Sequence, residues 1–190
     1  TIFIKVLKNN MFNIMSRYSI FLVVAAFIFV LAGCASPAKR EAMIPQGAVA
    51  IKSHPYSVNV QTSGGAETGV LDSSNISDAD LKAAIEDAIT QKKVFTKIVQ
   101  GSDADYELSV RIINLSKPIF GATFTVDMET AWILTKISDD SVVMRKAIKS
   151  TGKASISDAL AAVVRIRVAV ENSARDNIDQ GLKEIMELNF

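Results

Sequence analysis

The stretch DYELSVRIINL, residues 105–115, decides the fold class because apolar and polar side chains alternate along most of it. A period of two is typical of a β-strand that buries one face and exposes the other. The stretch therefore predicts a strand of a half-buried sheet. The apolar positions are Tyr106, Leu108, Val110 and Ile112, and the polar positions are Glu107, Ser109 and Arg111.

The same alternation returns in residues 121–137, GATFTVDMETAWILTKI. Asp139, Asp140 and Ser141 then predict a turn into a third run, VVMRKAIKST, at residues 142–151. Three successive strands with short connections predict an antiparallel meander whose apolar face needs a cover. In the second strand that face carries Phe124, Val126, Met128, Trp132 and Leu134, opposite Thr123, Thr125, Asp127 and Glu129.

Two amphipathic helices are expected to supply the cover. Ser77 has the position of an N-cap, with Asp80 three residues later, and this helix should end near Lys93. A second start signal is predicted at residues 155–158, SISD. Residues 163–170, VVRIRVAV, alternate like a strand, but their helical context favours a helix. The apolar stripes are Leu81, Ala84, Ile85, Ala88 and Ile89 in the first helix, and Ala174, Ile178, Leu182, Ile185 and Met186 in the second.

Arg167 and Glu171 lie one turn apart within the apolar stripe of the second helix. Charges embedded in an apolar face usually pair, because pairing offsets the loss of hydration. Two interpretations remain open: a structural ion pair that fastens the helix to the edge of the sheet, or a contact for a partner protein. The structural pair is favoured.

Residues 47–61, GAVAIKSHPYSVNVQ, precede the first helix and alternate on both sides of Pro55. Val49 and Ile51, and then Val58 and Val60, predict an edge strand or two short strands, since Pro cannot donate to a central ladder. The following loop contains three glycines but lacks the Lys and hydroxyl of a phosphate-binding loop. The predicted fold is α+β, an antiparallel sheet of four or five strands with two helices packed on one face.

Residues 15–34, MSRYSIFLVVAAFIFVLAGC, have the anatomy of a signal peptide: a basic start, an apolar run and small residues at the end. The apolar run is shorter than the roughly 20 residues that span a membrane comfortably. A buried core helix or a transmembrane anchor is the alternative. We expect the natural start at Met11 or Met15, and a leader and signal peptide over residues 1–33.

The sequence Leu31-Ala32-Gly33-Cys34 resembles the lipobox of bacterial lipoproteins. The resemblance implies that the chain is cut before Cys34, which then carries diacylglycerol on its sulfur and an acyl chain on its new amino group. A free buried thiol is the alternative. In that family an Asp after the cysteine favours the inner membrane. Ala35 stands there, which implies the inner leaflet of the outer membrane, facing the periplasm.

Residues 34–46 are expected to form the lipidated cysteine and a flexible tether, because ASPAKREAMIPQ is small, charged and contains proline. Residues 47–190 should then form a single α+β periplasmic domain. The membrane, reached through the lipid on Cys34, is thus one expected partner.

Composition excludes several classes of function. The chain has 21 basic and 20 acidic residues, so no electrostatic footprint for nucleic acid is present. Its single cysteine permits neither an internal disulfide nor a multi-cysteine metal site. The single histidine, His54, lacks an evident catalytic partner. Acidic pairs in the turns and on the outer strand faces suggest solvated carboxylates. We expect no cofactor, no metal and no enzymatic activity.

The order strand, helix, strands, helix is similar to small periplasmic lipoproteins of the YajG kind and, more distantly, to the TolB-N-terminal-like fold. The first functional hypothesis is a non-catalytic envelope lipoprotein that docks to a partner protein during envelope assembly, transport or maintenance. The alternative is a carrier of a lipid or glycan ligand, which a cavity lined by Phe124, Met128 and Trp132 would favour. An enzyme ranks third.

Overall fold

The computed structural model describes residues 35–47, 52–69 and 72–189. The chain divides into two units, Thr1–Cys34 and Ala35–Phe190, and all the described elements belong to the second. The predicted signal peptide, Cys34, Val49 and Ile51 lie outside the described residues. The elements are α2 (Arg40–Met43), β1 (His54–Ser63), α3 (Asp78–Lys92), β2 (Phe95–Ile98), β3 (Tyr106–Ser116), β4 (Phe124–Lys136), β5 (Ser141–Ala154) and α4 (Ala162–Glu187).

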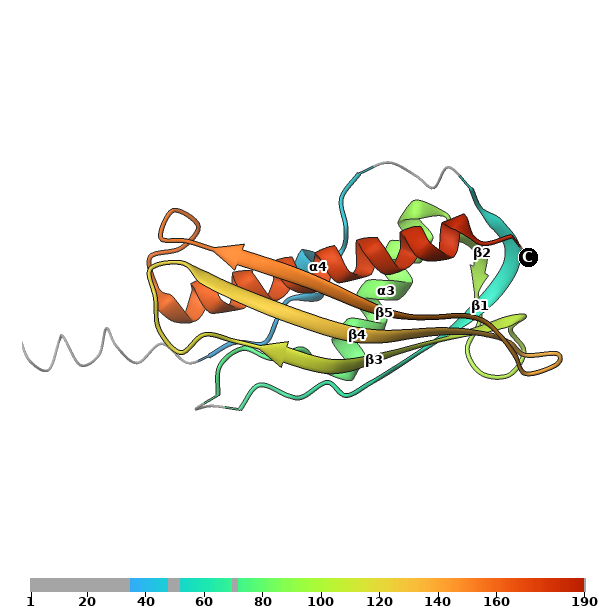
Figure 1. The fold of residues 1–190 in the computed structure, drawn as a ribbon, viewed down its shortest axis with the longest axis horizontal. Helices are drawn as coiled ribbons and strands as arrows, with labels where there is room; N and C mark the ends of the chain where they lie inside the picture. Colours follow the sequence, from blue (N-terminus) through green and yellow to red (C-terminus); the bar gives the residue numbers. More distant parts are fainter. Residues whose placement is uncertain (1–34, 48–51, 70–71, 190) are drawn as a thin grey trace, which may run out of the picture. The chain divides into compact units, whose positions relative to one another are not determined.

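The five strands form one mixed sheet in the order β2-β1-β3-β4-β5 (Figure 1). The predicted meander is confirmed, since β3 pairs antiparallel with β4 and β4 with β5. The expectation of a purely antiparallel sheet is wrong, because β1 runs parallel to both β2 and β3. The physical reason is the helix α3, which returns the chain across the sheet before β2 and so lets β2 run in the direction of β1.

The alternation in the meander places its apolar side chains in the core. Leu108, Trp132 and Leu134 are fully buried, as expected for one shared face. The turn between β4 and β5 lies at Asp139 and Asp140, as predicted. There the Asp139 carboxylate accepts hydrogen bonds from the backbone N–H and the hydroxyl of Ser141.

Helix α3 begins and ends where the sequence predicts. The Ser77 hydroxyl oxygen accepts a hydrogen bond from the backbone N–H of Asp80 at 3.1 Å. At the other end Lys93 adopts the left-handed conformation with φ 57°, and its N–H reaches the last carbonyls of the helix. Leu81, Ile85 and the other apolar residues of the stripe face the sheet side and are buried.

Helix α4 contains the ambiguous stretch 163–170, so the helical interpretation is confirmed. Its start differs from the prediction, because the helix begins at Ala162 rather than near Ser155. The Asp158 carboxylate accepts hydrogen bonds from the backbone N–H and hydroxyl of Ser155, which close a separate turn. A short polar side chain that bonds to nearby backbone offers an alternative to the helix at that point.

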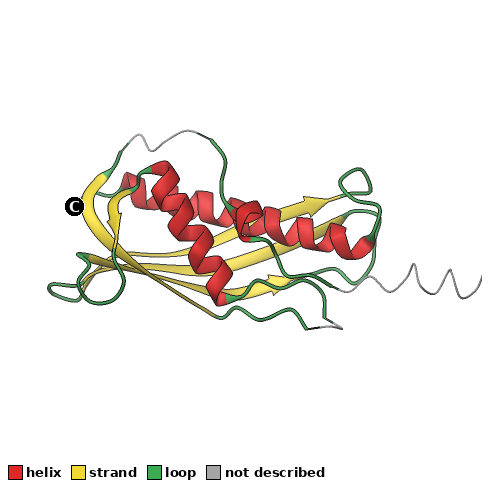
Figure 2. Cartoon of the chain, turned by 180° about the vertical axis from the view of Figure 1, so that it is seen from behind, coloured by secondary structure: helices red, strands yellow, loops and turns green. Residues whose placement is uncertain are grey.

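Both long helices pack on one face of the sheet, as expected (Figure 2). Two glycines permit the close approach of α4. A Cβ added at Gly152 of β5 would lie 2.0 Å from the Ala169 carbonyl oxygen. A Cβ added at Gly181 of α4 would lie 2.5 Å from the ring of Trp132. Glycine is therefore required on the strand at one contact and on the helix at the other.

The N-terminal segment differs from the expected tether. Ala38, Met43 and Ile44 are buried and belong to the hydrophobic core. The segment contains the single-turn helix α2, and the Arg40 guanidinium forms two hydrogen bonds with the Asp87 carboxylate on α3. Packing of Met43 and Ile44 supplies apolar burial that offsets the lost chain entropy, so these residues are part of the domain rather than a linker.

Candidate functional site

Arg167 and Glu171, the predicted ion pair, lie one turn apart on α4. The Arg167 Nε and Glu171 Oε1 atoms are 3.5 Å apart, and the Glu171 side chain is 7% exposed. Glu171 Oε1 also accepts a hydrogen bond from the backbone N–H of Lys39 at 2.9 Å. Arg167 Nη1 donates to the Ser36 hydroxyl oxygen at 3.0 Å.

These hydrogen bonds show that the ion pair contacts a different part of the chain from the one expected. The favoured interpretation had the pair fasten α4 to the edge of the sheet. Both residues instead bond to the N-terminal segment, through Ser36 and Lys39. The pair therefore holds the residues that directly follow Cys34 against α4.

Arg165, which no sequence pattern singled out, connects two loops at one end of the sheet. Its Nη1 atom donates to the carbonyl oxygens of Ala159 at 3.0 Å and Leu160 at 2.6 Å, and Nη2 donates to that of Gly121 at 3.4 Å. The guanidinium also lies 5.3 Å from the ring centroid of Phe124. The side chain is buried, so a charge in the core orders the loops 117–123 and 155–161.

We call these two loops together the apolar end. Their sequences, KPIFGAT and SISDALA, place large apolar side chains in solvent. The exposed fractions are 94% for Ile119, 87% for Phe120, 86% for Leu160 and 51% for Ile156. Isolated exposed apolar residues are ordinary, but these four lie on two loops that Arg165 connects, and such a group of residues is typical of a contact surface.

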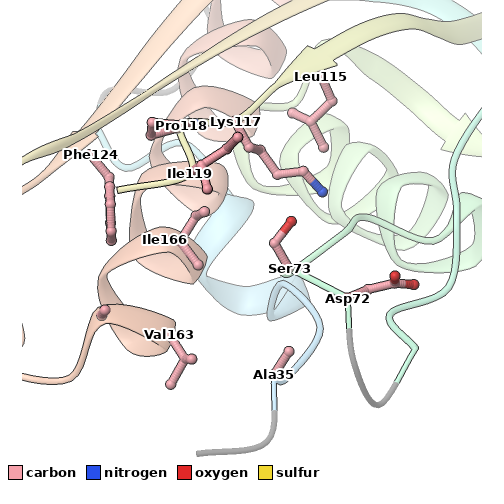
Figure 3. A pocket seen from close by; sticks show the side chains of 11 residues that line it. Ala35, Asp72, Ser73, Leu115, Lys117, Pro118, Ile119, Phe124, Val163 and Ile166 are labelled. Atoms are coloured by element: carbon pink, nitrogen blue, oxygen red, sulfur yellow. The ribbon is translucent and has the colours of Figure 1, made fainter. Parts of the chain in front are cut away.

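A pocket of about 610 Å³ adjoins the apolar end (Figure 3). Its walls come from the end of β3, the start of α4 and the N-terminal segment, and most of its lining is apolar. Lys117 points toward the loop before α3, where its Nζ donates to the Ser74 carbonyl oxygen at 3.1 Å and to Asn75 Oδ1. Burial lowers the pKa of Lys117. Apolar residues in the lining are Ala35, Leu115, Pro118, Ile119, Phe124, Ala162, Val163 and Ile166.

The described part of the chain does not contain the single cavity, lined by Phe124, Met128 and Trp132, that would have favoured a carrier. Phe124 lines the pocket described above, whereas Met128 lines a separate surface pocket. Trp132 is fully buried, and its indole N–H donates to the hydroxyl of Thr130 at 2.9 Å. Thr130 in turn donates to Asn177 Oδ1 at 2.6 Å. The three predicted residues therefore do not line one cavity.

His54 is buried at the start of β1 and its ring is engaged by the backbone. Its Nε2 atom lies 2.9 Å from the Ile185 carbonyl oxygen, and a carbonyl can only accept, so Nε2 carries the proton. Burial, opposed by this hydrogen bond, lowers the pKa of His54. The arrangement fits a structural role in joining β1 to the end of α4.

The described residues contain neither a metal cluster nor a membrane-spanning helix. No group of His, Cys, Asp and Glu residues in this part of the chain could hold a metal ion. None of the described helices combines the length and apolar character that crossing a membrane requires.

No protein-family model matches the sequence, and no curated protein matches it. Among solved structures, the fold is similar to a Xanthomonas campestris protein described by the family model DUF330. The TM-score is 0.56 at 12% identity, over 75% of this chain and 90% of that chain. At such identity the comparison shows a shared fold.

Two lipoproteins also match the chain at lower scores. Lipoprotein B of Nitrosomonas europaea, described as uncharacterised, matches with a TM-score of 0.48 at 14% identity, over 74% of this chain and 88% of that chain. A minor lipoprotein of Acinetobacter baumannii matches with a TM-score of 0.41 at 10% identity, over 70% and 94%. The resemblance to lipoproteins of the YajG kind stays a prediction.

Proposed function

We propose that this chain is a lipid-anchored, non-catalytic lipoprotein of the cell envelope that acts as an accessory or docking factor for other envelope proteins. The lipobox Leu31-Ala32-Gly33-Cys34 supplies the anchor in this proposal. The processes served would be assembly, transport or maintenance of the envelope, with an envelope protein as the partner.

The packing of the N-terminal segment is the observation that carries the proposal. Arg167 and Glu171 bond to Ser36 and Lys39, and Ala38 is buried two residues further on from Ser36. A lipid on Cys34 would therefore hold the domain directly at the membrane surface. This arrangement suits a protein that presents a rigid domain at a fixed place and differs from the long-reach tether expected from composition.

The proposed location is the outer membrane, with the domain in the periplasm. Support comes from Ala35, which stands where the lipoproteins retained in the inner membrane carry Asp. The proposal that the protein is non-catalytic rests on the hydrogen bonds that His54 and Arg165 make to backbone carbonyls. His54 binds the Ile185 carbonyl, and Arg165 binds loop carbonyls. Both side chains are thus committed to holding the fold together.

Replacement of Cys34 by Ser tests the anchor. We expect an unprocessed precursor or release from the membrane fraction, because a hydroxyl cannot form the thioether to diacylglycerol. A Cys34→Ser variant that is still cut at the same site and sediments with outer membranes contradicts the proposal.

Ala35→Asp tests the location without removing the lipid. We expect a lipidated protein that moves from the outer to the inner membrane fraction, as density-gradient separation of the two membranes would show. Ala35→Ser is the matched control and should leave the distribution unchanged. An unchanged distribution of the Asp variant contradicts the outer-membrane assignment and leaves the anchor intact.

The alternative function, a carrier of lipid, is favoured by one observation. The pocket beside the apolar end has the volume of a small-molecule site and a largely apolar lining that includes Leu115, Phe124 and Ile166. Saturable binding of a fluorescent fatty acid to the full chain, lost in Ile166→Asp but kept in Ile113→Asp, would support this alternative. Ile113 is an exposed residue of β3 outside the pocket lining.

A further inference from the structure

The apolar end lies where the chain leaves the expected lipid attachment. Ala35 lines the same pocket as Pro118, Ile119 and Val163 (Figure 3). Cys34 is bonded to Ala35, and consecutive Cα atoms are about 3.8 Å apart. A lipid on Cys34 would thus enter the bilayer beside the exposed side chains of the two loops.

The loops have the chemistry of a surface that enters the membrane interface. Residues 118–123, PIFGAT, contain no charged residue, and residues 155–161 contain one, Asp158. The Asp158 carboxylate bonds to the backbone N–H of Ser155 at 2.7 Å, and Lys117 is turned inward to Ser74 and Asn75. The most exposed side chains, Ile119, Phe120 and Leu160, are of the apolar types that lie at the boundary of headgroups and acyl chains.

The backbone of the two loops is held in place from inside the domain. Arg165 donates to carbonyls in both loops, and its buried guanidinium lies against Phe124. The apolar side chains are therefore presented on a fixed support, which reduces the entropy lost when they enter a membrane.

We infer that the apolar end inserts Ile119, Phe120 and Leu160 into the bilayer beside the lipid of Cys34, so that the domain has two attachments and one orientation. The inference rests on the proposed anchor at Cys34. A single attachment point would let the domain rotate, whereas the second one directs the opposite end of β3, β4 and β5 away from the membrane. The loops contact the acyl region of the membrane in this inference, since they lack the cluster of basic residues that would bind anionic headgroups.

A fluorescent probe in the full lipidated chain tests the inference. Cys34 is the only cysteine of the sequence, and lipidation consumes its sulfur, so Phe120→Cys introduces a single free thiol. Leu160→Cys provides a second position. Val142→Cys is the matched control, because Val142 is also an exposed apolar residue, 48% exposed, but lies on β5 at the far end of the sheet. Each variant is labelled with an environment-sensitive dye and reconstituted in phosphatidylcholine vesicles that contain acyl-chain nitroxide lipids.

We expect nitroxide quenching at positions 120 and 160 to exceed that at position 142 by roughly threefold or more, together with a blue shift of the emission. Quenching should change less than about twofold between about 0.1 M and 1 M salt, because apolar insertion is not screened.

The outcomes separate this inference from the proposed function. Equal quenching at all three positions, in protein whose lipid on Cys34 is verified by mass spectrometry, overturns the inference and leaves the anchor intact. A blue shift without nitroxide quenching means that another protein or a second copy covers the loops, and this also overturns it. An unmodified Cys34 overturns the proposed anchor and removes the basis of the inference.

Discussion

The three strands of the meander end in two very different sets of loops. At the polar end, residues 99–105 and 137–140 turn the chain with glycine, serine and aspartate. Asp105 bonds to Ser57 there, and the N–H of Ile137 donates to the Asp105 carbonyl. At the apolar end, residues 117–123 and 155–161 make the connections, and isoleucine, phenylalanine and leucine stand in solvent.

Each end contains one connection that reverses the chain between antiparallel neighbours: residues 137–140 between β4 and β5 at the polar end, and residues 117–123 between β3 and β4 at the apolar end. The polar end shows that short polar turns with satisfied backbone groups are sufficient for this sheet. A connection in this sheet can therefore be made without exposed apolar side chains. Large exposed apolar side chains on neighbouring loops instead indicate a surface that contacts a membrane or another protein.

The largest expected effect comes from Gly152→Ala near the apolar end, which is compared with Gly101→Ala at the polar end. Gly152→Ala forces a Cβ to within 2.0 Å of the Ala169 carbonyl oxygen, so α4 must move off the sheet. We expect a loss of about 3 kcal/mol in the free energy of unfolding. Gly101→Ala, at the polar end, meets nothing within 4 Å and loses only the preference for its φ of +81°, about 1–2 kcal/mol. Urea denaturation measures both.

Equal costs at Gly152 and Gly101 would contradict this prediction. They would mean that α4 can shift away from β5 at little cost in free energy, so that α4 does not hold the loops of the apolar end rigidly.

Arg165→Met should give the next largest effect, and it should act on the apolar end alone. The variant keeps an apolar stem but removes the donors to Ala159, Leu160 and Gly121. These hydrogen bonds are partly buried, and their loss from a charged donor should lower the free energy of unfolding by about 2–3 kcal/mol. Hydrogen exchange should rise in residues 117–123 and 155–161 and stay unchanged in residues 137–140. Uniform exchange at both ends would show that Arg165 does not order the apolar end.

The ion pair on α4 decides how firmly the N-terminal segment is held. Glu171→Ala leaves Arg167 and the Lys39 N–H without their shared acceptor, and Arg167→Ala leaves a buried carboxylate. We expect each to lower the free energy of unfolding by about 1–3 kcal/mol, and the double variant by less than the sum. Both should also increase proteolysis within residues 35–47. Lys146→Ala is the control, since the side chains of Lys146 and its partner Glu184 are 52% and 36% exposed, far more than that of Glu171.

Additive losses for the two variants would show that Arg167 and Glu171 act independently. Unchanged thermal melting with weaker envelope association would instead support the interpretation as a partner contact.

The smallest effect concerns pH and His54, at the polar end. Burial lowers its pKa below the ordinary value of 6.5. Between the folded-state pKa and 6.5 the unfolded chain binds a proton that the folded chain does not, so the free energy of unfolding falls as the pH decreases. His54→Gln, which can still donate to the Ile185 carbonyl, should flatten that dependence. Denaturant titrations between about pH 5 and pH 8 measure the slope. An identical slope in both proteins assigns the dependence to other groups.

Much of the fold was predictable because its signals are local. The period-two pattern of residues 105–115 specified the meander, and Ser77 with Asp80 specified the start of α3. The helix in residues 163–170 was ambiguous by pattern and followed from its context. The start of α4 was missed because the bonds between Asp158 and Ser155 form a turn with the same residue types as a helix cap.

The strands of the meander, the two long helices, the lipobox pattern and the spacing of Arg167 and Glu171 can be derived from the sequence alone, because each depends on residues within a few positions of one another. The parallel placement of β1, the burial of Met43 and the bonds of Arg165 to two loops depend instead on contacts between distant parts of the chain. The bond between Lys39 and Glu171 spans 132 residues. Such contacts depend on which surfaces meet when the core closes, and no periodicity along the chain encodes that choice.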